Sequence, residues 1–581
     1  MTSPWTSLDS SPGQRVFFRP LGTTESSFYW DSVFNSTADI VGHVHLRTTQ
    51  SNDSDIHSHP NVMRSWASVK RRFPLLAAEV QEYESGSRFI LREEAVANLR
   101  PDDVTFKEVN SLHHVECFIN DIMDGQRLLS SQLLARIYIL RRTDRHDHFH
   151  IVIIVAHCVT DAPSTSTVVR TFLDTLSSRI EPPYIPLGER VHTYQPLESR
   201  LSYGDLPLVK RRWRRALGHA ILTVWMSKFK GGQTLPGNFR QSTFRTPAKS
   251  RSHVSIFSSK VSSIILSNCR RHNITMNNAC YALSQVALAR VLCRRYLRGQ
   301  ILEEEWEYRK RQPMHFTGGL NLRPYQDMDW FQTGGSGDVG INISFFWYNL
   351  PFMPLGEMSK GDASKLELVD GAPDFPALMS FDRFLLRCAN VKAQAQKVFK
   401  HPRFVDICTA GHDRVASTRE VALKWLEMND GGLPEDDHEG IMPVQSLNPI
   451  ITQIGSTLGN METVIPLYYP LPLDQELSPL RSTTHPHLAG YPAWSPPTDA
   501  IEDAKIPRLH IEHWRAHIHA HPGEFYLAAT FAHQQLQYFT SYDQHVFSEE
   551  TVQEWMRELK DATLWYLGQP HGDEMPLQSK L

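Results

Sequence analysis

The sequence lacks a surplus of charge of either sign. Its 581 residues carry 60 Lys and Arg against 63 Asp and Glu, for a formal net charge of -3. Proteins that bind nucleic acids neutralise phosphates with a basic surplus or at least a basic face. The balance removes the bulk electrostatic argument for a nucleic-acid partner, and we expect none.

Long hydrophobic runs are also missing. The best run, from Ile151 to Ala156, falls far short of the roughly 18 residues that a helix needs to span a bilayer. At the N-terminus no basic stretch is followed by an apolar one, as a secretory signal would require. We therefore expect neither a transmembrane segment nor secretion.

Cysteine pairs and phosphate-binding loops are absent as well. The seven cysteines are odd in number, scattered, and contain no Cys-x-x-Cys pair, which argues against a disulfide framework or a cysteine zinc site. A reducing compartment fits this pattern better. No Gly-x-x-x-x-Gly-Lys loop occurs, and Gly334-Gly335-Ser336-Gly337 indicates only a turn.

What the chain does have is an informative ending. It closes with Ser579, Lys580 and Leu581, and a terminal Ser-Lys-Leu is the address that the peroxisomal import receptor reads. A random chain ends in this tripeptide roughly once in 8,000 cases, because each position matches about once in twenty. Residues 568–578 are polar and contain two prolines, so the tail should be accessible. The sequence predicts a peroxisomal protein with that receptor as a partner.

The body of the chain is globular in composition, with 41% apolar and 10% aromatic residues. Residues 1–26 have little periodicity and suggest a lead-in segment. Beyond them, hydrophobic periodicity predicts a mixed α/β protein in two halves. The expected strands are 40–46, 88–92, 133–140, 148–156, 254–257, 341–347, 525–531 and 536–541, and the clearest helices are 61–72, 164–176, 210–230, 275 onward and 548–566.

The strongest candidate for chemistry follows the hairpin formed by 133–140 and 148–156. The second strand is apolar almost throughout, so we expect it to be central and buried on both faces. It delivers His157 and, four residues later, Asp161, from the end of a rigid element. Ser164 is expected to cap the helix that follows.

The motif His157-x-x-x-Asp161 after an apolar strand resembles the chloramphenicol-acetyltransferase-like fold. Plant-type acyltransferases, peptide-synthetase condensation domains and fungal trichothecene O-acetyltransferases share this fold. Stretches that are similar to other parts of the superfamily occur in the expected order over residues 27–567: Arg-Phe-Pro-Leu-Leu-Ala at 72–77, Ile-Gly-Ser at 454–456, Val-Ile-Pro at 464–466, the strand 536–543 and Phe-Ser-Glu-Glu at 547–550. The plant Asp-Phe-Gly-Trp-Gly motif is absent, and Ala162 replaces the glycine that often follows the motif aspartate, which favours a fungal branch.

This resemblance implies a fold class and a domain plan. The fold would be α/β, with two lobes of mixed sheets flanked by helices and an active-site tunnel between the lobes. Residues 27–200 would form the N-terminal lobe, 201–250 a lobe-linking segment, 251–567 the C-terminal lobe and 568–581 a flexible tail. We expect a monomer.

The resemblance also implies acyl transfer, with acyl-CoA as co-substrate, no bound cofactor and no metal. A neutral imidazole can take a proton from a hydroxyl, so His157 is the predicted general base and Asp161 a structural residue. Arg323, in Asn-Leu-Arg-Pro at 321–324, is one candidate partner of Asp161. Thr452 and Ser456 are candidate oxyanion donors, although both can equally be ordinary strand hydroxyls.

The substrate follows from the resemblance and the tail together. A trichothecene-acetyltransferase-like chain with a peroxisomal terminus looks most like the acyltransferases of fungal mannosylerythritol lipid biosynthesis. These would transfer a short or medium acyl chain to a sugar hydroxyl of the glycolipid. O-acetylation of a sesquiterpenoid or polyketide alcohol is the alternative within the fold. A non-catalytic member that binds acyl groups or a partner is the alternative from another class.

Three further patterns have competing interpretations. Cys158 could be a nucleophile, but packing is the commoner role for such a thiol. The histidines at 510, 513, 517, 519 and 521 fall near helical spacing and could hold zinc, although the polar segment around them favours a solvated surface. The basic segment 210–230 could contact lipid, but we favour a lobe-bridging helix that packs its aromatic side on the core.

Overall fold

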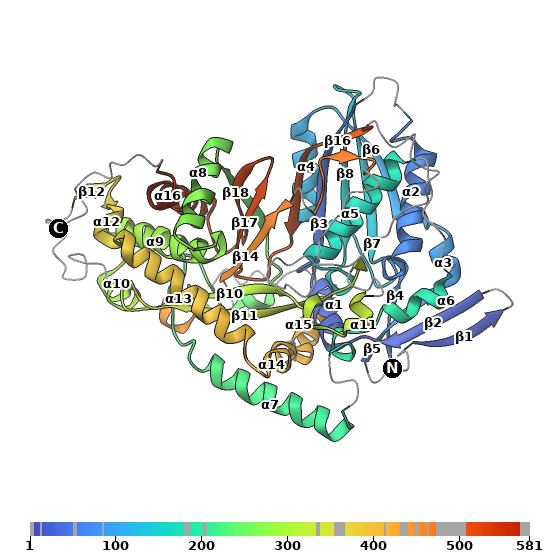
Figure 1. Cartoon of the computed structure of the whole chain (residues 1–581), viewed down its shortest axis with the longest axis horizontal. Coiled ribbons are helices and arrows are strands. Elements are labelled where there is room, and N and C mark those ends of the chain that lie inside the picture. The colour runs from blue at the N-terminus through green and yellow to red at the C-terminus, as the bar shows by residue number, and fades with distance from the viewer. Residues whose placement is uncertain are drawn as a thin grey trace.

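The structure is a computed structural model, in which residues 5–11, 14–49, 55–83, 86–178, 186–201, 206–332, 337–353, 367–411, 414–429, 440–447, 453–461, 464–471 and 507–569 are described. Two six-stranded sheets, each covered by helices, dominate it (Figure 1). The mixed α/β class expected from the sequence is therefore confirmed.

The first sheet contains the strand that leads to His157. Its order is β15 (Tyr468–Tyr469), β16 (Leu509–Ile518), β3 (Ile40–Thr48), β8 (His148–Val155), β7 (Ala135–Arg142) and β6 (Val104–Val109). Only β6 and β7 pair in parallel; the other neighbours are antiparallel. All eight residues of β8 are buried, as expected for a central strand whose apolar residues occupy both faces.

The second sheet is built from the later part of the chain. Its order is β11 (Ile343–Leu350), β10 (Met314–Asn321), β14 (Gln453–Asn460), β17 (Phe525–Ala532), β18 (Gln535–Asp543) and β9 (Ser250–Ile256). The strand β14 pairs in parallel with both β10 and β17, and the remaining pairs are antiparallel. Both large sheets are thus mixed.

Two strands from the later part of the chain, β15 and β16, belong to the first sheet. β16 pairs with β3 over its full length, although the sequence placed residues 251–567 in a single C-terminal lobe. Pairing with β16 satisfies the backbone groups of β3 on the side away from β8, which would otherwise be an open edge. The lobe boundaries themselves stay a prediction.

The N-terminal segment has more structure than the sequence indicated. A four-stranded antiparallel sheet runs in the order β1 (Thr6–Ser11), β2 (Gln14–Pro20), β5 (Gly86–Arg92) and β4 (Glu79–Tyr83). The sequence predicted only a lead-in over residues 1–26 and missed β1 and β2. Although β1 and β2 form a local hairpin, β2 also pairs with β5 about 70 positions further along the chain, a contact that leaves little local periodicity in the sequence.

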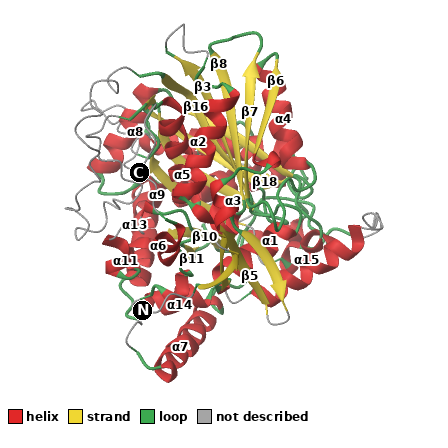
Figure 2. Cartoon of the chain, turned by 90° about the vertical axis from the view of Figure 1, so that its right-hand side faces the viewer, coloured by secondary structure: helices red, strands yellow, loops and turns green. Residues whose placement is uncertain are grey.

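Helices cover the faces of the sheets (Figure 2). Beside the first sheet, α2 (His59–Arg72) packs on α5 (Ala162–Ser177); beside the second, α9 (Met276–Leu297) packs on α16 (Glu549–Leu567) and α13 (Phe381–Phe399). The other helices are α1 (Thr23–Val33), α3 (Glu93–Ala97), α4 (Leu112–Asp124), α6 (Leu187–Arg190), α7 (Leu208–Met226), α8 (Ser259–Arg271), α10 (Glu303–Arg309), α11 (Met328–Gln332), α12 (Phe375–Leu378), α14 (Phe404–Ala410) and α15 (Val415–Asn429). None of these described helices is both long enough and apolar enough to cross a membrane.

Each large sheet has its own hydrophobic core. One cluster gathers the buried residues of β3, β7 and β8 with those of α2 and α5, and the other gathers those of β10, β17 and β18 with those of α9 and α16. The core around β3 is closely packed: a Cβ atom added at Gly42 would lie 3.0 Å from the ring of Trp514. The first core also takes in residues from the later part of the chain, among them Trp425 and Leu509, so the two cores do not coincide with two halves of the sequence.

Candidate active site

His157 lies just beyond the end of β8, where the chain turns through a short 3-10 helix (His157–Val159). Its side chain is buried, with 8% of the residue exposed. The imidazole stacks on the ring of Phe28 from α1, with 4.1 Å between ring centroids and 16° between the planes. A strand end and an aromatic neighbour therefore fix the orientation of this ring.

The surroundings keep this imidazole neutral. Burial lowers the pKa of His157 from its ordinary value, and the charges of Asp161 and Asp39 only partly oppose this effect. A neutral imidazole has one nitrogen free of a proton and can act as a base near neutral pH. Its Nδ1 has no hydrogen-bond partner among the described residues.

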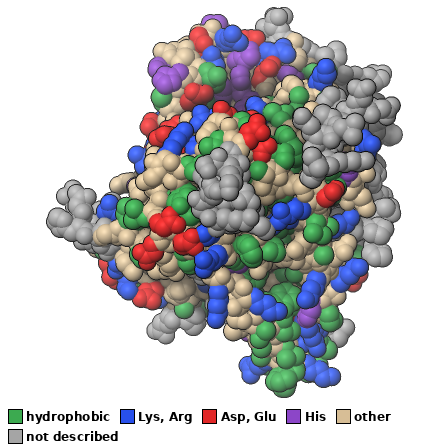
Figure 3. All heavy atoms as spheres, turned by 90° about the vertical axis from the view of Figure 1, so that its left-hand side faces the viewer, with side chains coloured by type: hydrophobic (Ala, Val, Ile, Leu, Met, Phe, Trp, Pro, Cys, Tyr) green, Lys and Arg blue, Asp and Glu red, His purple; other side chains and the backbone are tan. Residues whose placement is uncertain are grey.

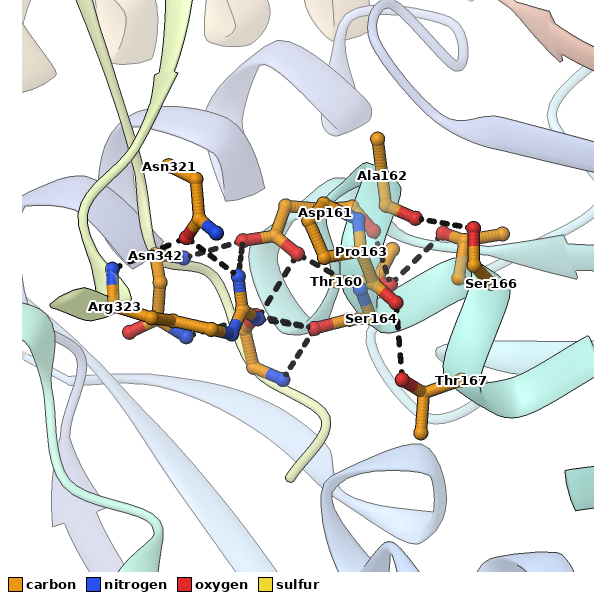
Figure 4. Close-up of polar contacts among 12 residues, drawn as sticks. Thr160, Asp161, Ala162, Pro163, Ser164, Ser166, Thr167, Asn321, Arg323 and Asn342 are labelled. Carbon is orange, nitrogen blue, oxygen red and sulfur yellow. Dashed lines mark hydrogen bonds and ion pairs between the residues drawn. The ribbon is translucent and has the colours of Figure 1, made fainter. Parts of the chain in front are cut away.

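Asp161 is held by two residues from the later part of the chain (Figure 4). Arg323 donates from Nη1 to Oδ2 at 2.8 Å and from Nη2 to Oδ1 at 3.0 Å. The backbone N–H of Asn342 donates to Oδ2 at 2.8 Å. Asp161 and Arg323 are each 1% exposed, so this two-point ion pair is fully desolvated. The structure thus places Arg323 against Asp161, the partner that the sequence suggested.

Ser164 joins the same network. Arg323 Nη2 donates to its Oγ at 2.6 Å, and the Oγ donates to the carbonyl oxygen of Gly340 at 2.7 Å. The expectation that Ser164 caps the following helix was wrong: Asp161 is the N-cap, and its Oδ1 accepts the backbone N–H of Ser164 at 3.0 Å. Since Pro163 in the first turn needs no backbone partner, α5 can begin at Ala162.

The contacts of Asp161 explain its charge. Burial acts to raise the pKa of this carboxyl, but the charge and hydrogen bonds of Arg323 and the two backbone donors outweigh burial and leave the pKa lowered. Within the part of the chain that the structure describes, the carboxylate is hydrogen-bonded to Arg323 and to the backbone of Ser164 and Asn342, and not to His157. The carboxylate therefore shapes the loop that carries His157, while His157 itself is the residue that can exchange a proton.

Three residues of this site were missed by sequence reasoning. They are Phe28, Gly340 and Asn342, which supply the stacked ring and the backbone contacts described above. Phe28 lies in a helix with no motif around it. Gly340 lies three residues after the Gly-rich stretch at 334–337, and Asn342 falls in the expected strand 341–347, but neither pattern indicated a role at this site.

The remaining site predictions cannot be located in the same way. Thr452 lies outside the described residues. Ser456 lies on β14, but its side chain is outside the described part of the structure. Ser579, Lys580 and Leu581 also lie outside the described residues. The two oxyanion donors and the targeting tripeptide stay predictions.

Cys158 is poorly suited to act as a nucleophile. The residue is 1% exposed and burial raises the pKa of its thiol far above the ordinary value. The reactive form of cysteine is the thiolate, and this environment disfavours it. All seven cysteines are free thiols, and six of them are buried.

The histidines at 510–521 do not form a helix or a solvated surface. His510, His513 and His517 lie on strand β16, and His517 and His519 are each only 6% exposed. The polar composition suggested a solvated surface, but β16 pairs with β3, which in turn pairs with β8, and both of these strands carry histidines too. We call the six that lie together the histidine cluster: His43, His45, His148, His150, His513 and His517. The described residues contain no group of three or more side chains placed to hold a metal ion.

A pocket of about 840 Å³ opens beside α1. Tyr29, Arg127 and Trp425 are among its lining residues, and Tyr29 follows the Phe28 that stacks on His157. Arg127 donates to Asp39 at 3.0 Å, and Asp39 is one of the charges that act on His157. The pocket therefore adjoins the surroundings of the candidate base, although His157 is not one of its described lining residues.

Comparisons with known proteins identify the fold. No protein-family model matches the sequence, and no curated protein matches it. Among solved structures, the TRI3 trichothecene 15-O-acetyltransferase from Fusarium sporotrichioides has 11% sequence identity and a TM-score of 0.63, covering 97% of this chain and 98% of its own. The EpoB cyclization-docking bidomain of a nonribosomal peptide synthetase from Sorangium cellulosum has 11% identity and a TM-score of 0.55, covering 96% of this chain and 85% of its own.

A third similar structure is the SgcC5 protein from Streptomyces globisporus, with 13% identity, a TM-score of 0.52, and coverage of 95% of this chain and 99% of its own. At these identities the similarity concerns the fold alone. It extends over nearly the whole chain, and it confirms the expected fold: mixed sheets and helices in the two-lobed chloramphenicol-acetyltransferase-like arrangement.

Proposed function

We propose that the chain is an acyl-CoA-dependent O-acyltransferase in which His157 is the general base. The observation that carries this proposal is the position of His157: a buried, neutral imidazole at the end of a central strand, in a loop clamped by the Asp161–Arg323 ion pair. The similarity in fold to TRI3, whose name describes an O-acetyltransferase, supports the same chemistry.

In the proposed reaction, His157 takes the proton of an acceptor hydroxyl as its oxygen attacks the carbonyl carbon of the thioester. The resulting tetrahedral intermediate collapses, the C–S bond breaks, and the imidazolium gives its proton to the departing CoA thiolate. The products are an ester and free CoA, and no acyl-enzyme forms. The buried Asp161 takes no part in proton transfer, since its carboxylate is occupied by Arg323 and backbone N–H groups.

The proposed acceptor is a sugar hydroxyl of a mannosylerythritol-type glycolipid, acylated with a short or medium fatty chain. The resemblance noted in the sequence and the Ser579-Lys580-Leu581 ending support this choice. A sesquiterpenoid alcohol, which would be O-acetylated, is the second candidate, favoured by the similarity in fold to the trichothecene acetyltransferase.

The test is acylation by the purified full chain, read by mass spectrometry. The chain is incubated with acyl-CoAs of increasing length and either a mannosylerythritol acceptor or a sesquiterpenoid alcohol. We expect ester formation on the sugar lipid and none with folded His157→Ala. If only the sesquiterpenoid alcohol is acylated, the proposed acceptor is wrong, while the proposed mechanism stands. Undiminished transfer by His157→Ala would reject His157 as the base.

We further propose that the protein is imported into peroxisomes through its last three residues. The support is the sequence of the tail alone. A fluorescent protein fused to the N-terminus should give punctate peroxisomal signal, and the same fusion placed after Leu581 should remain in the cytosol. Peroxisomal signal from the C-terminal fusion would contradict the assignment.

A further inference from the structure

The helix α7 stands out on the surface of the molecule. It runs along the bottom of the view in Figure 1 and packs against α14. Of its 19 residues only Gly218 is buried, where the helix approaches the backbone of Asp406. The expectation that the aromatic side of this segment packs on the core holds only in part: Trp225 and Phe229 contact the rings of His401 and His315, with 5.5 and 5.2 Å between ring centroids, but Trp213 does not pack on the core. Trp213 is 65% exposed.

Most of the exposed apolar side chains of α7 lie on one face, apart from Leu208 at its first position, which is 55% exposed. Val209, Trp213 and Val224 are 77%, 65% and 60% exposed, and they are spaced by four and eleven residues. Since a helix repeats every 3.6 residues, these spacings place them in one row. The exposed Ala216 and Ala220 extend the row between Trp213 and Val224. An apolar row more than two turns long thus faces solvent.

Basic residues border this row on both sides. Successive helical residues turn by about 100°, so Lys210 lies about 60° to one side of Trp213 and Arg212 about 100° to the other. From residue 208 to 230 there is no acidic residue, and the cations are Lys210, Arg211, Arg212, Arg214, Arg215, Lys228 and Lys230. Figure 3 shows the lowest part of the molecule as hydrophobic side chains edged by Lys and Arg.

One cation of α7 is used to attach the helix. Arg214 points toward α14, where its Nε donates to Asp406 Oδ2 at 3.2 Å, and Gly218 lies one turn further along on the same side. This attachment lies roughly opposite the apolar row, because Gly218 is about 140° around the helix from Trp213. The helix is therefore mounted with its apolar row and bordering cations directed away from the body.

We propose that this face of α7 docks on the surface of a membrane that contains anionic lipids. An apolar row with a central tryptophan suits the boundary between headgroups and acyl chains, where Trp is favoured. The bordering cations attract anionic headgroups. Charge complementarity selects this partner, since the chain as a whole has a net charge of -3 while this segment is purely basic. A nucleic acid would pair with the cations but would leave the aliphatic side chains in water.

This docking is peripheral and does not depend on the proposed acyl transfer. The helix would lie parallel to the membrane plane, with Trp213 and Val224 inserted and α14 on the protein side. The probe is sedimentation of the purified full chain with vesicles of phosphatidylcholine, alone or mixed with phosphatidylserine. We expect the chain to bind the mixed vesicles, to bind the neutral ones weakly, and to be released as salt is raised.

Two sets of variants test separately how much the cations and the apolar row of α7 contribute to vesicle binding. Replacing Lys210 and Arg212, the two cations that border the row, by Gln should weaken partitioning onto the mixed vesicles by about 30-fold, since each cation near the surface contributes about fivefold. Trp213→Ala should weaken it about tenfold, through loss of the inserted ring. These exposed side chains can be replaced without disturbing the core, and circular dichroism and thermal unfolding check that the fold is kept.

The matched control substitutions are made at exposed positions of another helix, α13. Leu386→Ala on α13 removes an apolar side chain that is 69% exposed. The double variant Lys397→Gln, Lys400→Gln removes two exposed cations near the C-terminal end of the same helix. These variants should partition like the unaltered chain. The proposal is overturned if no vesicle is bound, if neutral and anionic vesicles bind equally, or if the α7 variants behave like the controls. Binding to soluble polyglutamate in place of vesicles would identify an acidic protein partner and would also overturn it.

Discussion

At the scale of single residues, burial determines the acid–base behaviour of His157. Because burial lowers its pKa, the imidazole stays neutral to more acidic pH than a free histidine, whose pKa is about 6.5. In the pH profile of kcat/KM, the acidic limb should therefore fall with an apparent pKa below 6.5. His157→Gln should lower kcat by about 10²- to 10⁴-fold, the usual contribution of a general base.

A matched measurement separates this effect from general damage. His146 is exposed on the turn between β7 and β8, and His146→Gln should leave both the rate and the acidic limb unchanged. An acidic limb that persists with the same pKa in the residual activity of His157→Gln would assign the titration to another group.

The Asp161–Arg323 ion pair positions the loop that carries His157. Removing one partner of a buried ion pair leaves the other charge desolvated, which costs about 3–5 kcal/mol. Arg323→Gln should therefore lower the thermal midpoint markedly. Arg323→Lys keeps the charge but cannot form both contacts to the carboxylate, so we expect partial recovery of stability with kcat reduced more than KM is raised.

The exposed pair Lys424–Glu420 on α15 supplies the comparison. Lys424→Gln should leave the unfolding midpoint unchanged, because exposed pairs contribute little to stability. Equal destabilisation by Lys424→Gln and Arg323→Gln would show that burial of the Asp161–Arg323 pair is not what matters.

At the scale of elements, the contact between α7 and α14 depends on the absence of a side chain at one position. A Cβ at Gly218 would lie 2.4 Å from the carbonyl oxygen of Asp406, closer than any real contact allows. Gly218→Leu should therefore separate the two helices, with a cost of about 1–3 kcal/mol for overpacking, and make α7 more susceptible to proteolysis. Ala220→Leu, at an exposed position two residues on, should leave the cleavage rate unchanged.

The elements that sequence alone identified are those whose signal is local. The helix α9 begins at Met276, next to the expected start at residue 275, and β8 has an apolar pattern that predicts burial on both faces. The strand β16 was missed because its histidines repeat at near-helical spacing. Its strand character comes from pairing with β3, which is more than 460 positions away. The pairing of β2 with β5 likewise leaves no local signal.

The same distinction holds for the candidate site. His157 and Asp161 are four residues apart and follow one strand, so a local motif was enough to find them. Arg323 was suggested by resemblance, and the fold brings it to Asp161 across 162 positions. The stacking of Phe28 on His157 results from the packing of α1 against the loop after β8, for which the sequence carries no motif.

At the scale of the whole molecule, the two halves of the chain are joined by polar contacts as well as by β16. The ion pair of Asp161 with Arg323 fixes the loop after β8 to the segment between β10 and β11. Arg414, just before α15, donates to Asp31 on α1 at 2.6 Å, with Ser27 as a second acceptor at 3.0 Å. Both contacts involve elements next to His157. A movement of one half relative to the other would therefore displace residues of the candidate site.

The histidine cluster should make the stability of the whole fold depend on pH. Its members pair through ring nitrogens, His43 with His150 at 3.0 Å and His45 with His148 at 2.9 Å, and in each pair at least one ring must be neutral, because only an unprotonated nitrogen can accept. Burial, followed by neighbouring imidazoles and arginines, lowers their pKa values. The pKa falls to about 4 for His45 and His513, about 3 for His517 and about 2 for His150.

Acidification should destabilise the fold, because the pKa values of these histidines are lower in the folded protein than in the unfolded chain. In the unfolded chain each histidine binds a proton near pH 6.5, whereas in the fold the pKa of each cluster member is lowered, to about 4 or below for His45, His150, His513 and His517. Below pH 6.5 the unfolded state therefore holds more protons, so stability is full above about pH 7 and falls steadily as the pH drops toward 4. Unfolding midpoints in urea, measured from pH 7.5 to 5, should decrease accordingly. His517→Leu should reduce the proton uptake on unfolding by about one, because this ring is fully buried, whereas the exposed His146→Gln should leave the uptake nearly unchanged; equal slopes for both variants would exclude the cluster as the cause.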